Sequence, residues 1–541
     1  AVVLLVALAY GAWLVWLSSD AYVWGDDWHF LLHRGTVAGE EQGGLMTPFN
    51  GHWSILMILT YRALFALVGM TTYVPFVAVL VLFHIAICIA MHLLLRRAGA
   101  HPWVAAAVAL TILFTGVAPE MVVFDAAMNH SGSILCGLVA VLALIRADAD
   151  RRGTAVAWIA LALAVMWSST GISAIIIAAV FATIQWGRPA GLRVASVPTL
   201  AFLFWYVGWG RHDRGAQLTW DAVAGAPQYI WTGLTKVFGS AVAIPELGPV
   251  VFVVLMLNLV TDRDSSPVLR HLAWSGVAAA TVQLLLESLT RGHMGIEAAS
   301  TGRYAYFSLV LLAPLLCLAL VRLSRLTVDP RWLPVAAMSL ALAGYAVHGV
   351  NQVRQYSDGY ASVSRAWLDR LHGMVASADD GQRMITSTYD ELVNHGLSQD
   401  LIASDEVRRA LPDGEPSAQG RLGAETMFNV GVGTQTYDLF NPAFVDLAYG
   451  WNRGIRKLPG CASYTATVDN PMLQIATLDG IEIGITSDAT EVTTRLVRDD
   501  VTADGRIWQV PAGAIHVAST AKDALLQVSF NAPGEYIICK Q

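Results

Sequence analysis

Two adjacent carboxylates follow the first apolar run of the chain and are its first candidates for chemistry. They stand in the segment Trp24-Gly25-Asp26-Asp27-Trp28-His29, shortly after the apolar run 2–18. Like charges side by side at a membrane are costly, so such groups usually have a function there. One of them could take a proton from an acceptor hydroxyl as a general base, or both could supply oxygen ligands to a divalent cation. The alternative is a pair of solvated loop residues.

Cationic and further polar side chains lie in the later segments between apolar runs. An arginine there can neutralise a lipid-linked phosphate, because its guanidinium offers a planar fork of donors. Alternatively, each single arginine has no functional role and only places its apolar stem along the membrane, with its charge at the interface. The candidate phosphate ligands are Arg211, Lys236, Arg291 and Arg303, and the candidate substrate-binding residues are His29, His52, Glu120, Asp125 and Tyr304.

Long apolar runs must position these residues. The chain is 55% hydrophobic and 14% charged, whereas a soluble domain carries about 25% charge. A membrane-spanning helix needs about 20 mostly apolar residues. We divide the stretch 154–187 at Ser168-Ser169-Thr170-Gly171, because it is too long for one crossing. The predicted spans are 2–18, 73–95, 102–117, 130–146, 154–168, 170–187, 194–210, 247–261, 271–288, 304–321 and 332–349.

Arginines set the orientation of these eleven spans. They recur in every second connecting segment, as in Arg96-Arg97 and Arg151-Arg152, and basic segments stay in the cytoplasm. We therefore expect a multi-pass plasma-membrane protein with a cytoplasmic N-terminus and an extracytoplasmic C-terminal part. The outer segments are long, and two of them contain candidate helices at the membrane surface, His52–Val68 and Asp221–Phe238.

The chain changes character near Asn351. Residues 1–349 form the predicted membrane domain and residues 350–541 a water-soluble domain, in which a helix is expected over Ser357–Ala376. Short alternating runs after Ala424 predict a mainly-β, sandwich-like fold. These runs are Leu473–Thr477, Glu482–Ile485, Glu491–Val497, Arg506–Val510, Leu525–Phe530 and Glu535–Cys539.

Cysteines and metal ligands are few in the C-terminal part. Cys461 and Cys539 are its only cysteines, and an exported pair can form a disulfide. No CxxC or His/Cys cluster indicates a structural zinc, so we assign no metal ligand.

Several short motifs together resemble the GT-C superfamily of glycosyltransferases, which use polyprenyl-phosphate sugars. The likeness covers about residues 1–349. An acidic pair follows the first span, and a histidine lies in the second. Lysine is rare among the basic residues, which indicates a high-GC genome and agrees with actinobacterial members. The motifs are Asp26-Asp27, Phe49-Asn-Gly-His-Trp-Ser54, His84, Pro119-Glu120 and Thr301-Gly-Arg-Tyr304.

The resemblance implies an inverting sugar transfer at the outer face of the membrane. The donor would be a polyprenyl-phosphate sugar and the acceptor a cell-envelope glycan or glycolipid. By this match Asp26 or Asp27 is the base, Arg303 the first phosphate ligand and Arg211 the second. Oligosaccharyltransferase-like members have a spaced Asp-X-Asp and a metal, whereas this pair has no spacer, which leaves a divalent cation open. The C-terminal part resembles, in placement only, the carbohydrate-binding domains of membrane arabinofuranosyltransferases.

Two other functions fit a polytopic chain. A transporter or flippase of lipid-linked glycans usually shows internal repeats and charges in mid-span, and we find no repeat. A non-catalytic scaffold that displays a binding domain has no need of the acidic first segment. We expect lipid and glycan partners and no nucleic acid.

Overall fold

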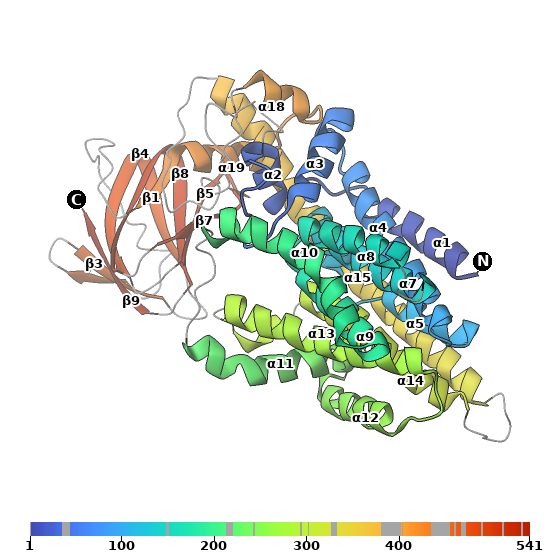
Figure 1. The fold of residues 1–541 in the computed structure, drawn as a ribbon. Helices are drawn as coiled ribbons and strands as arrows, with labels where there is room; N and C mark the ends of the chain where they lie inside the picture. The colour runs from blue at the N-terminus through green and yellow to red at the C-terminus, as the bar shows by residue number, and fades with distance from the viewer. Residues whose placement is uncertain are drawn as a thin grey trace. The chain divides into compact units, whose positions relative to one another are not determined.

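The structure is a computed structural model with a helical part followed by an antiparallel sheet (Figure 1). This confirms the prediction of a helical part followed by a mainly-β part. The described residues are 2–34, 44–147, 151–212, 220–241, 244–292, 295–300, 302–325, 333–379, 402, 404–433, 455–458, 461–466, 472–487, 491–510, 513–531 and 534–540.

Each of the eleven apolar runs contains a helix. Those helices are α1 (Val2–Leu17), α4 (Val74–Arg97), α5 (Pro102–Leu113), α7 (Met128–Ala147), α8 (Arg151–Trp167), α9 (Gly171–Trp186), α10 (Arg188–Gly208), α12 (Gly248–Thr261), α13 (Pro267–Arg291), α14 (Gly302–Leu323) and α15 (Leu333–Asp379). Among the described residues, five helical segments are long and apolar enough to cross a membrane, at Val74–Arg97, Asp125–Arg146, Arg188–Gly208, Pro267–Arg291 and Gly302–Leu323. The number of crossings and their direction stay predictions.

Prolines and glycines mark where these helices begin and end. A proline stands in the first turn of α4, α5, α10, α12 and α13, where its missing N–H costs no hydrogen bond. Helix α9 ends at Trp186, and the φ of 90° at the next residue, Gly187, favours glycine. The break at Ser168–Thr170 separates α8 from α9, as predicted.

Shorter helices connect the apolar ones. The two candidate surface helices are present as α3 (Ile55–Val68) and α11 (Trp220–Ala241). The acidic pair Asp26-Asp27 lies in the first turn of a short helix. Other short elements are α2 (Asp26–His33), α6 (Glu120–Val123), η1 (Asp125–Ala127), η2 (Gly210–His212), η3 (Pro245–Leu247), η5 (Ile296–Ser300), α18 (Asp405–Ala410) and α19 (Ala418–Asn429).

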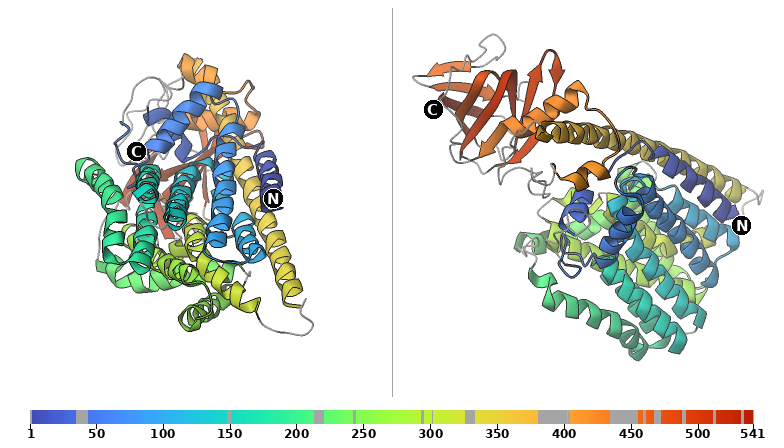
Figure 2. Two further views of the ribbon diagram at one scale, coloured as in Figure 1. Left: turned by 45° about the vertical axis from the view of Figure 1, so that its right-hand side comes forward. Right: turned by 90° about the horizontal axis from the view of Figure 1, so that it is seen from above.

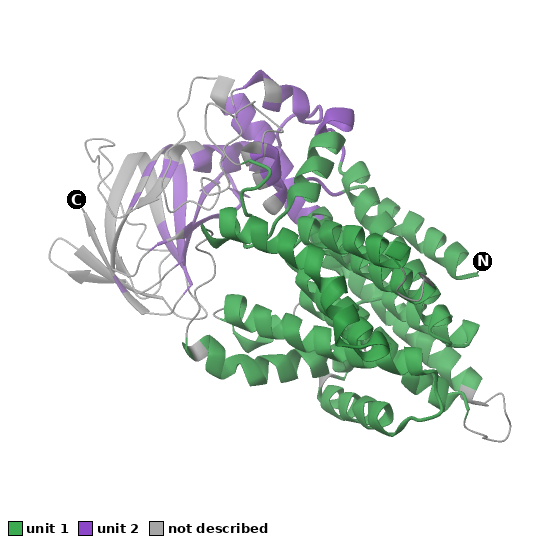
Figure 3. Ribbon diagram, viewed as in Figure 1, with its two compact units in different colours: residues 1–20, 43–64, 73–360 green, residues 21–42, 65–72, 361–541 purple. Residues whose placement is uncertain are grey.

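The chain forms two compact units (Figure 3). Unit 1 contains residues 1–20, 43–64 and 73–360, and unit 2 contains residues 21–42, 65–72 and 361–541. The predicted boundary near Asn351 lies inside α15, which runs unbroken from Leu333 to Asp379 (Figure 2). Helix α15 therefore contributes its first part to unit 1 and its last part to unit 2.

The strands of unit 2 pair into one antiparallel sheet. Its order is β2-β3-β9-β4-β8-β5-β6, with β1 on β8 and β7 on β5. The strands are β1 (Val430–Gly433), β2 (Ile455–Leu458), β3 (Cys461–Ala466), β4 (Met472–Ser487), β5 (Glu491–Arg498), β6 (Val501–Thr502), β7 (Arg506–Gln509), β8 (Gly513–Phe530) and β9 (Gly534–Lys540).

Hydrogen bonds join the described strands into a single sheet, whereas we expected the two sheets of a sandwich. The reason lies in β4 and β8, which are long enough to serve several partners. The runs Leu473–Thr477 and Glu482–Ile485 are one strand, because an irregularity between Asp479 and Ile481 lets the ladder continue.

The predicted disulfide falls on two neighbouring strands. Cys461 and Cys539 face each other in the β3–β9 register, where Cα atoms are about 4.5–5.5 Å apart. That spacing suits a disulfide. The two side chains lie outside the described part of the chain, so the bond stays a prediction.

Candidate functional site

A two-residue hairpin positions His52 in unit 1. Asn50 and Gly51 have φ angles of 50° and 79°, and Phe49 and His52 exchange backbone hydrogen bonds of 3.1 and 2.9 Å. Asn-Gly is the preferred pair for such a turn, because both residues tolerate positive φ. The Trp53 ring, which follows, stacks on Trp205 of α10 at 5.6 Å. The segment Phe49–Ser54, which carried the family resemblance, is thus a tight turn held in place by the stacking of Trp53 on Trp205.

His52 lies against the turn between α8 and α9 and against the start of α7. Its Nδ1 is 3.2 Å from Ser168 Oγ and also contacts Ser169 Oγ. The His52 ring meets the buried His130 ring edge to face at 5.5 Å, and His130 packs on Phe307 of α14. Two histidines and two serine hydroxyls from three separate segments therefore form one polar group.

Glu120 and Arg303 come together at the first turn of α14. Glu120 Oε1 accepts a hydrogen bond from the Arg303 backbone N–H at 2.7 Å, and it lies 4.0 Å from Arg303 Nε. A Cβ on Gly302 would be 2.2 Å from the Glu120 carboxyl carbon, so a larger residue there would displace this carboxylate from the start of α14. The carboxylate caps the helix and complements its positive end. The Arg303 side chain is 49% exposed and lies over the Tyr304 ring, so its guanidinium can reach a ligand.

Arg291 brings a second cation to the same region. At the end of α13, its Nη2 donates to the Asn50 carbonyl at 3.1 Å and so holds the hairpin. Arg291, Arg303 and His52 all act electrostatically on His130. The hairpin, the first turn of α14 and the last turn of α13 therefore share one charged neighbourhood.

Glu287 belongs to this neighbourhood, and our sequence analysis missed it. It is 5% exposed, its Oε1 accepts from Gln283 Nε2 at 2.6 Å, and it interacts electrostatically with Arg303. The side-chain oxygen of Gln283, Oε1, accepts from the Ser173 hydroxyl of α9. The signal was an acidic residue inside the apolar run 271–288, because an intramembrane carboxylate is a candidate for function by its position alone.

Two tyrosines outside the predicted spans adjoin these charges. The pKa of Tyr356 is raised to about 12, chiefly by burial and also by the nearby Glu120 charge, while Arg303 opposes this rise. Burial also raises the pKa of Tyr229 well above its usual value, and the charge of Glu287 adds to this. Both hydroxyls therefore stay protonated near neutral pH and can donate hydrogen bonds.

Asp125, a predicted substrate ligand, is buried and held by two tyrosines. Its Oδ2 accepts from the Tyr61 hydroxyl at 2.9 Å and its Oδ1 from the Tyr73 hydroxyl at 3.1 Å. The Asp125 backbone N–H in turn donates to the Tyr73 oxygen at 2.9 Å. These contacts tie α3 and the start of α4 to the start of α7, which is the work of a structural residue.

The acidic pair belongs to unit 2 and opens helix α2. Asp27 is buried and its Oδ2 accepts from the Trp24 backbone N–H at 3.3 Å. Negative charge is favoured in the first turn of a helix. Trp28, the next residue, packs edge to face on Trp367 of α15. The side chains of Asp26 and His29 lie outside the described part of the chain.

The remaining predicted phosphate ligands have different surroundings. Lys236 of α11 forms an ion pair with Glu297 of η5, and Arg211 is exposed on η2. Within the described residues, no hydrogen bond or ion pair joins Arg211 to the other predicted ligands. The structure thus groups Arg303, Arg291 and Glu120 but leaves Arg211 apart.

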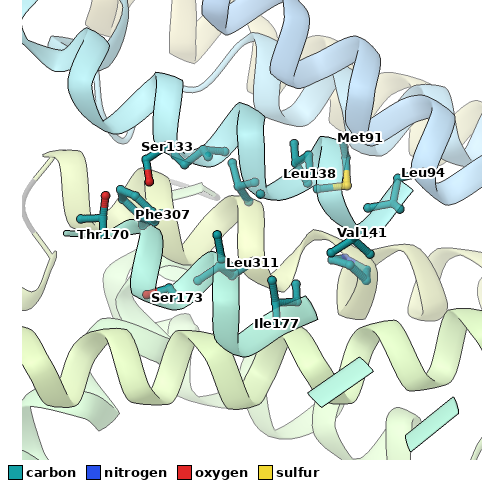
Figure 4. Close-up of a pocket in the computed structure, with 15 residues that line it drawn as sticks. Met91, Leu94, Ser133, Leu138, Val141, Thr170, Ser173, Ile177, Phe307 and Leu311 are labelled. Atoms are coloured by element: carbon teal, nitrogen blue, oxygen red, sulfur yellow. The ribbon is translucent and has the colours of Figure 1, made fainter. Parts of the chain in front are cut away.

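A small cavity lies among α4, α7, α9 and α14 (Figure 4). Its volume is about 30 Å³, which suits about one water molecule and no sugar. Ser133 and Thr170 lie toward one end with Phe307, and Met91 and Leu94 line the other. The cavity is therefore a packing void.

No cation site is formed by the described side chains. Among them, no three His, Cys, Asp or Glu residues gather as metal ligands. The oxygen donors that a divalent cation prefers are separately engaged at Glu120, Asp125 and Asp27.

Comparison with known proteins gives one structural likeness. No family model matches the sequence, and no curated protein matches it. The fold is similar to the crystal structure of the Archaeoglobus fulgidus oligosaccharyltransferase in complex with Zn and sulfate, with a TM-score of 0.36 and 15% sequence identity. The similarity covers 69% of this chain and 55% of that chain, so this chain spans about half of that protein's length.

Proposed function

We propose that the protein is a membrane glycosyltransferase that moves a sugar from a polyprenyl-phosphate donor to a glycan or glycolipid acceptor at the outer face of the plasma membrane. The observation that supports this most is the half-exposed Arg303 at the first turn of α14, with Arg291 and the two histidines nearby. Two cations beside the ends of apolar helices suit a lipid phosphate, because both the charge and the membrane position match.

In the proposed reaction an acceptor hydroxyl attacks the anomeric carbon of the donor sugar. The bond from that carbon to the phosphate oxygen breaks, and the configuration at the carbon inverts. Asp27 takes the acceptor proton, and Arg303 stabilises the negative charge that grows on the leaving phosphate. The products are a glycosylated acceptor and polyprenyl monophosphate. Asp26 has a supporting part, and Glu120 keeps Arg303 and its helix in place.

Binding of polyprenyl monophosphate tests the phosphate site, because this lipid is the product whatever sugar is moved. Native mass spectrometry of the protein in nanodiscs measures its affinity. A charge-assisted hydrogen bond contributes about 1.5–3 kcal/mol, so Arg303→Ala should weaken binding about 10- to 150-fold. Arg303→Lys should restore part of this, since lysine lacks the fork.

Arg325→Ala is the matched control, since Arg325 is an exposed arginine just after the opposite end of α14. It should bind polyprenyl monophosphate as the wild type does. Equal losses in the two alanine variants would show that general positive charge, rather than this site, binds the lipid. A protein that binds the lipid yet never releases it from a sugar donor would instead fit a flippase or a non-catalytic scaffold.

A further inference from the structure

Glu287 has an oxygen that the protein itself does not use. Its Oε1 is held by Gln283, which Ser173 holds in turn. Its Oε2 is buried and has no hydrogen-bond partner among the described residues. An unpaired buried acceptor costs about 1–3 kcal/mol, and more when it is charged. These two hydrogen bonds fix one carboxyl oxygen of Glu287 and leave the other without a partner among the described residues. Such an arrangement suits a carboxyl group that binds a ligand.

Tyr229 of α11 is in the same situation. Its side chain is 2% exposed and its hydroxyl has no partner in the described part of the chain. It lies close enough to interact electrostatically with Glu287, Tyr304 and Arg291, yet none of the described hydrogen bonds joins it to Glu287. Helices α13 and α11 thus bring Glu287 Oε2 and the Tyr229 hydroxyl into one neighbourhood, and neither group has a hydrogen-bond partner among the described residues.

We propose that Glu287 Oε2 and the Tyr229 hydroxyl bind a hydroxyl group of the donor sugar. This rests on the proposed function, because Arg303 and Arg291 would hold the phosphate, and Arg303 interacts electrostatically with Glu287 and Arg291 with Tyr229. A sugar hydroxyl can donate to the carboxylate and accept from the phenol at once. Gln283 and Ser173 are then positioning residues that orient the carboxylate.

The test compares a lipid phosphate without a sugar with lipid phosphates that carry one. Polyprenyl monophosphate reports the phosphate site alone, and polyprenyl-phosphate mannose, glucose and arabinofuranose report the sugar as well. Glu287→Gln should weaken binding of the preferred sugar lipid about 2- to 13-fold, because an amide NH₂ replaces one carboxyl oxygen and a hydrogen bond of about 0.5–1.5 kcal/mol is lost, and leave the monophosphate unchanged. Tyr229→Phe should show the same selectivity to a smaller extent. Glu246→Gln, which changes an exposed carboxylate on η3, should bind both lipids normally.

A donor that lacks one sugar hydroxyl completes the design. If that hydroxyl contacts Glu287, the deoxy donor binds the wild type more weakly, but the Glu287→Gln variant loses nothing further. Equal losses for both lipids would mean a structural role, and no loss for either would mean that only water occupies the two groups. Either result overturns the inference while the phosphate site stands. A wild type that binds neither lipid would instead refute the proposed function.

Discussion

Glu120 is the residue whose replacement separates helix capping from charge pairing most clearly. Its carboxylate makes one good hydrogen bond, 2.7 Å to the Arg303 amide, and only a 4.0 Å approach to the Arg303 guanidinium. Both side chains are partly exposed, at 28% and 49%, so the ion pair itself contributes little. Loss of a helix cap costs about 0.5–2 kcal/mol. We therefore expect Glu120→Ala to loosen the first turn of α14 without unfolding the protein.

Hydrogen exchange at the Arg303 amide measures this directly, because local opening controls its rate. A cost of about 0.5–2 kcal/mol corresponds to about 2- to 30-fold faster exchange in Glu120→Ala. Glu120→Gln keeps an acceptor oxygen and loses only the interaction with the helix dipole, about 0.3–1 kcal/mol, which gives about 2- to 5-fold. Amides in the middle of α14 are the internal control. Exchange at the Arg303 amide of Glu120→Ala that is no faster than in the wild type, or acceleration throughout α14, would refute the capping role.

Three further predictions follow from individual contacts. Gly51→Val should destabilise the hairpin by about 1–3 kcal/mol, because a β-branched residue is strained at a φ of 79°. Hydrogen exchange at the His52 amide should then be faster, and an unchanged rate would contradict the predicted strain. Asp125→Ala should lower the free energy of unfolding by about 1–3 kcal/mol, because the buried Tyr61 hydroxyl loses the carboxylate oxygen that accepts from it, and an unchanged denaturation midpoint contradicts this. Peptide mapping without reductant should find Cys461 linked to Cys539, whereas two freely alkylated thiols would show that the opposed positions on β3 and β9 are not bonded.

The helices were predictable because their signal is strong and local. Runs of apolar residues bounded by prolines and glycines predict where α4, α5 and α9 begin and end to within a few residues. The long strands β4 and β8 were not predictable, since the glycine at Gly480 indicates a turn, and only the partner strands decide whether the ladder continues. The same holds for α15, because the change to polar residues near Asn351 marks a change of environment and not the end of a helix.

The candidate site was predicted in its residue types more than in its arrangement. The sequence offers Glu120 and Arg303 as candidates, but only folding brings their separate segments to one helix end. The segment Phe49–Ser54 was recognised only by its resemblance to a family motif. In the structure its role is physical, because its Asn-Gly turn directs His52 toward Ser168 and Ser169. Glu287 was overlooked because a single carboxylate hardly lowers the mean hydropathy of a long apolar run. The contacts of Asp27 in α2 depend on packing in unit 2, which no short motif encodes.

Turnover of a lipid-phosphate sugar tests the central claim most directly. Purified protein in proteoliposomes is given polyprenyl-phosphate mannose, glucose or arabinofuranose with a cell-envelope glycan extract, and the release of polyprenyl monophosphate is followed. The account predicts release that depends on the acceptor, and that Asp27→Asn slows by about 10²- to 10⁴-fold while donor binding stays intact. Asp26→Asn should slow it less. Binding of these donors without any release, or full turnover in both variants, would contradict the account.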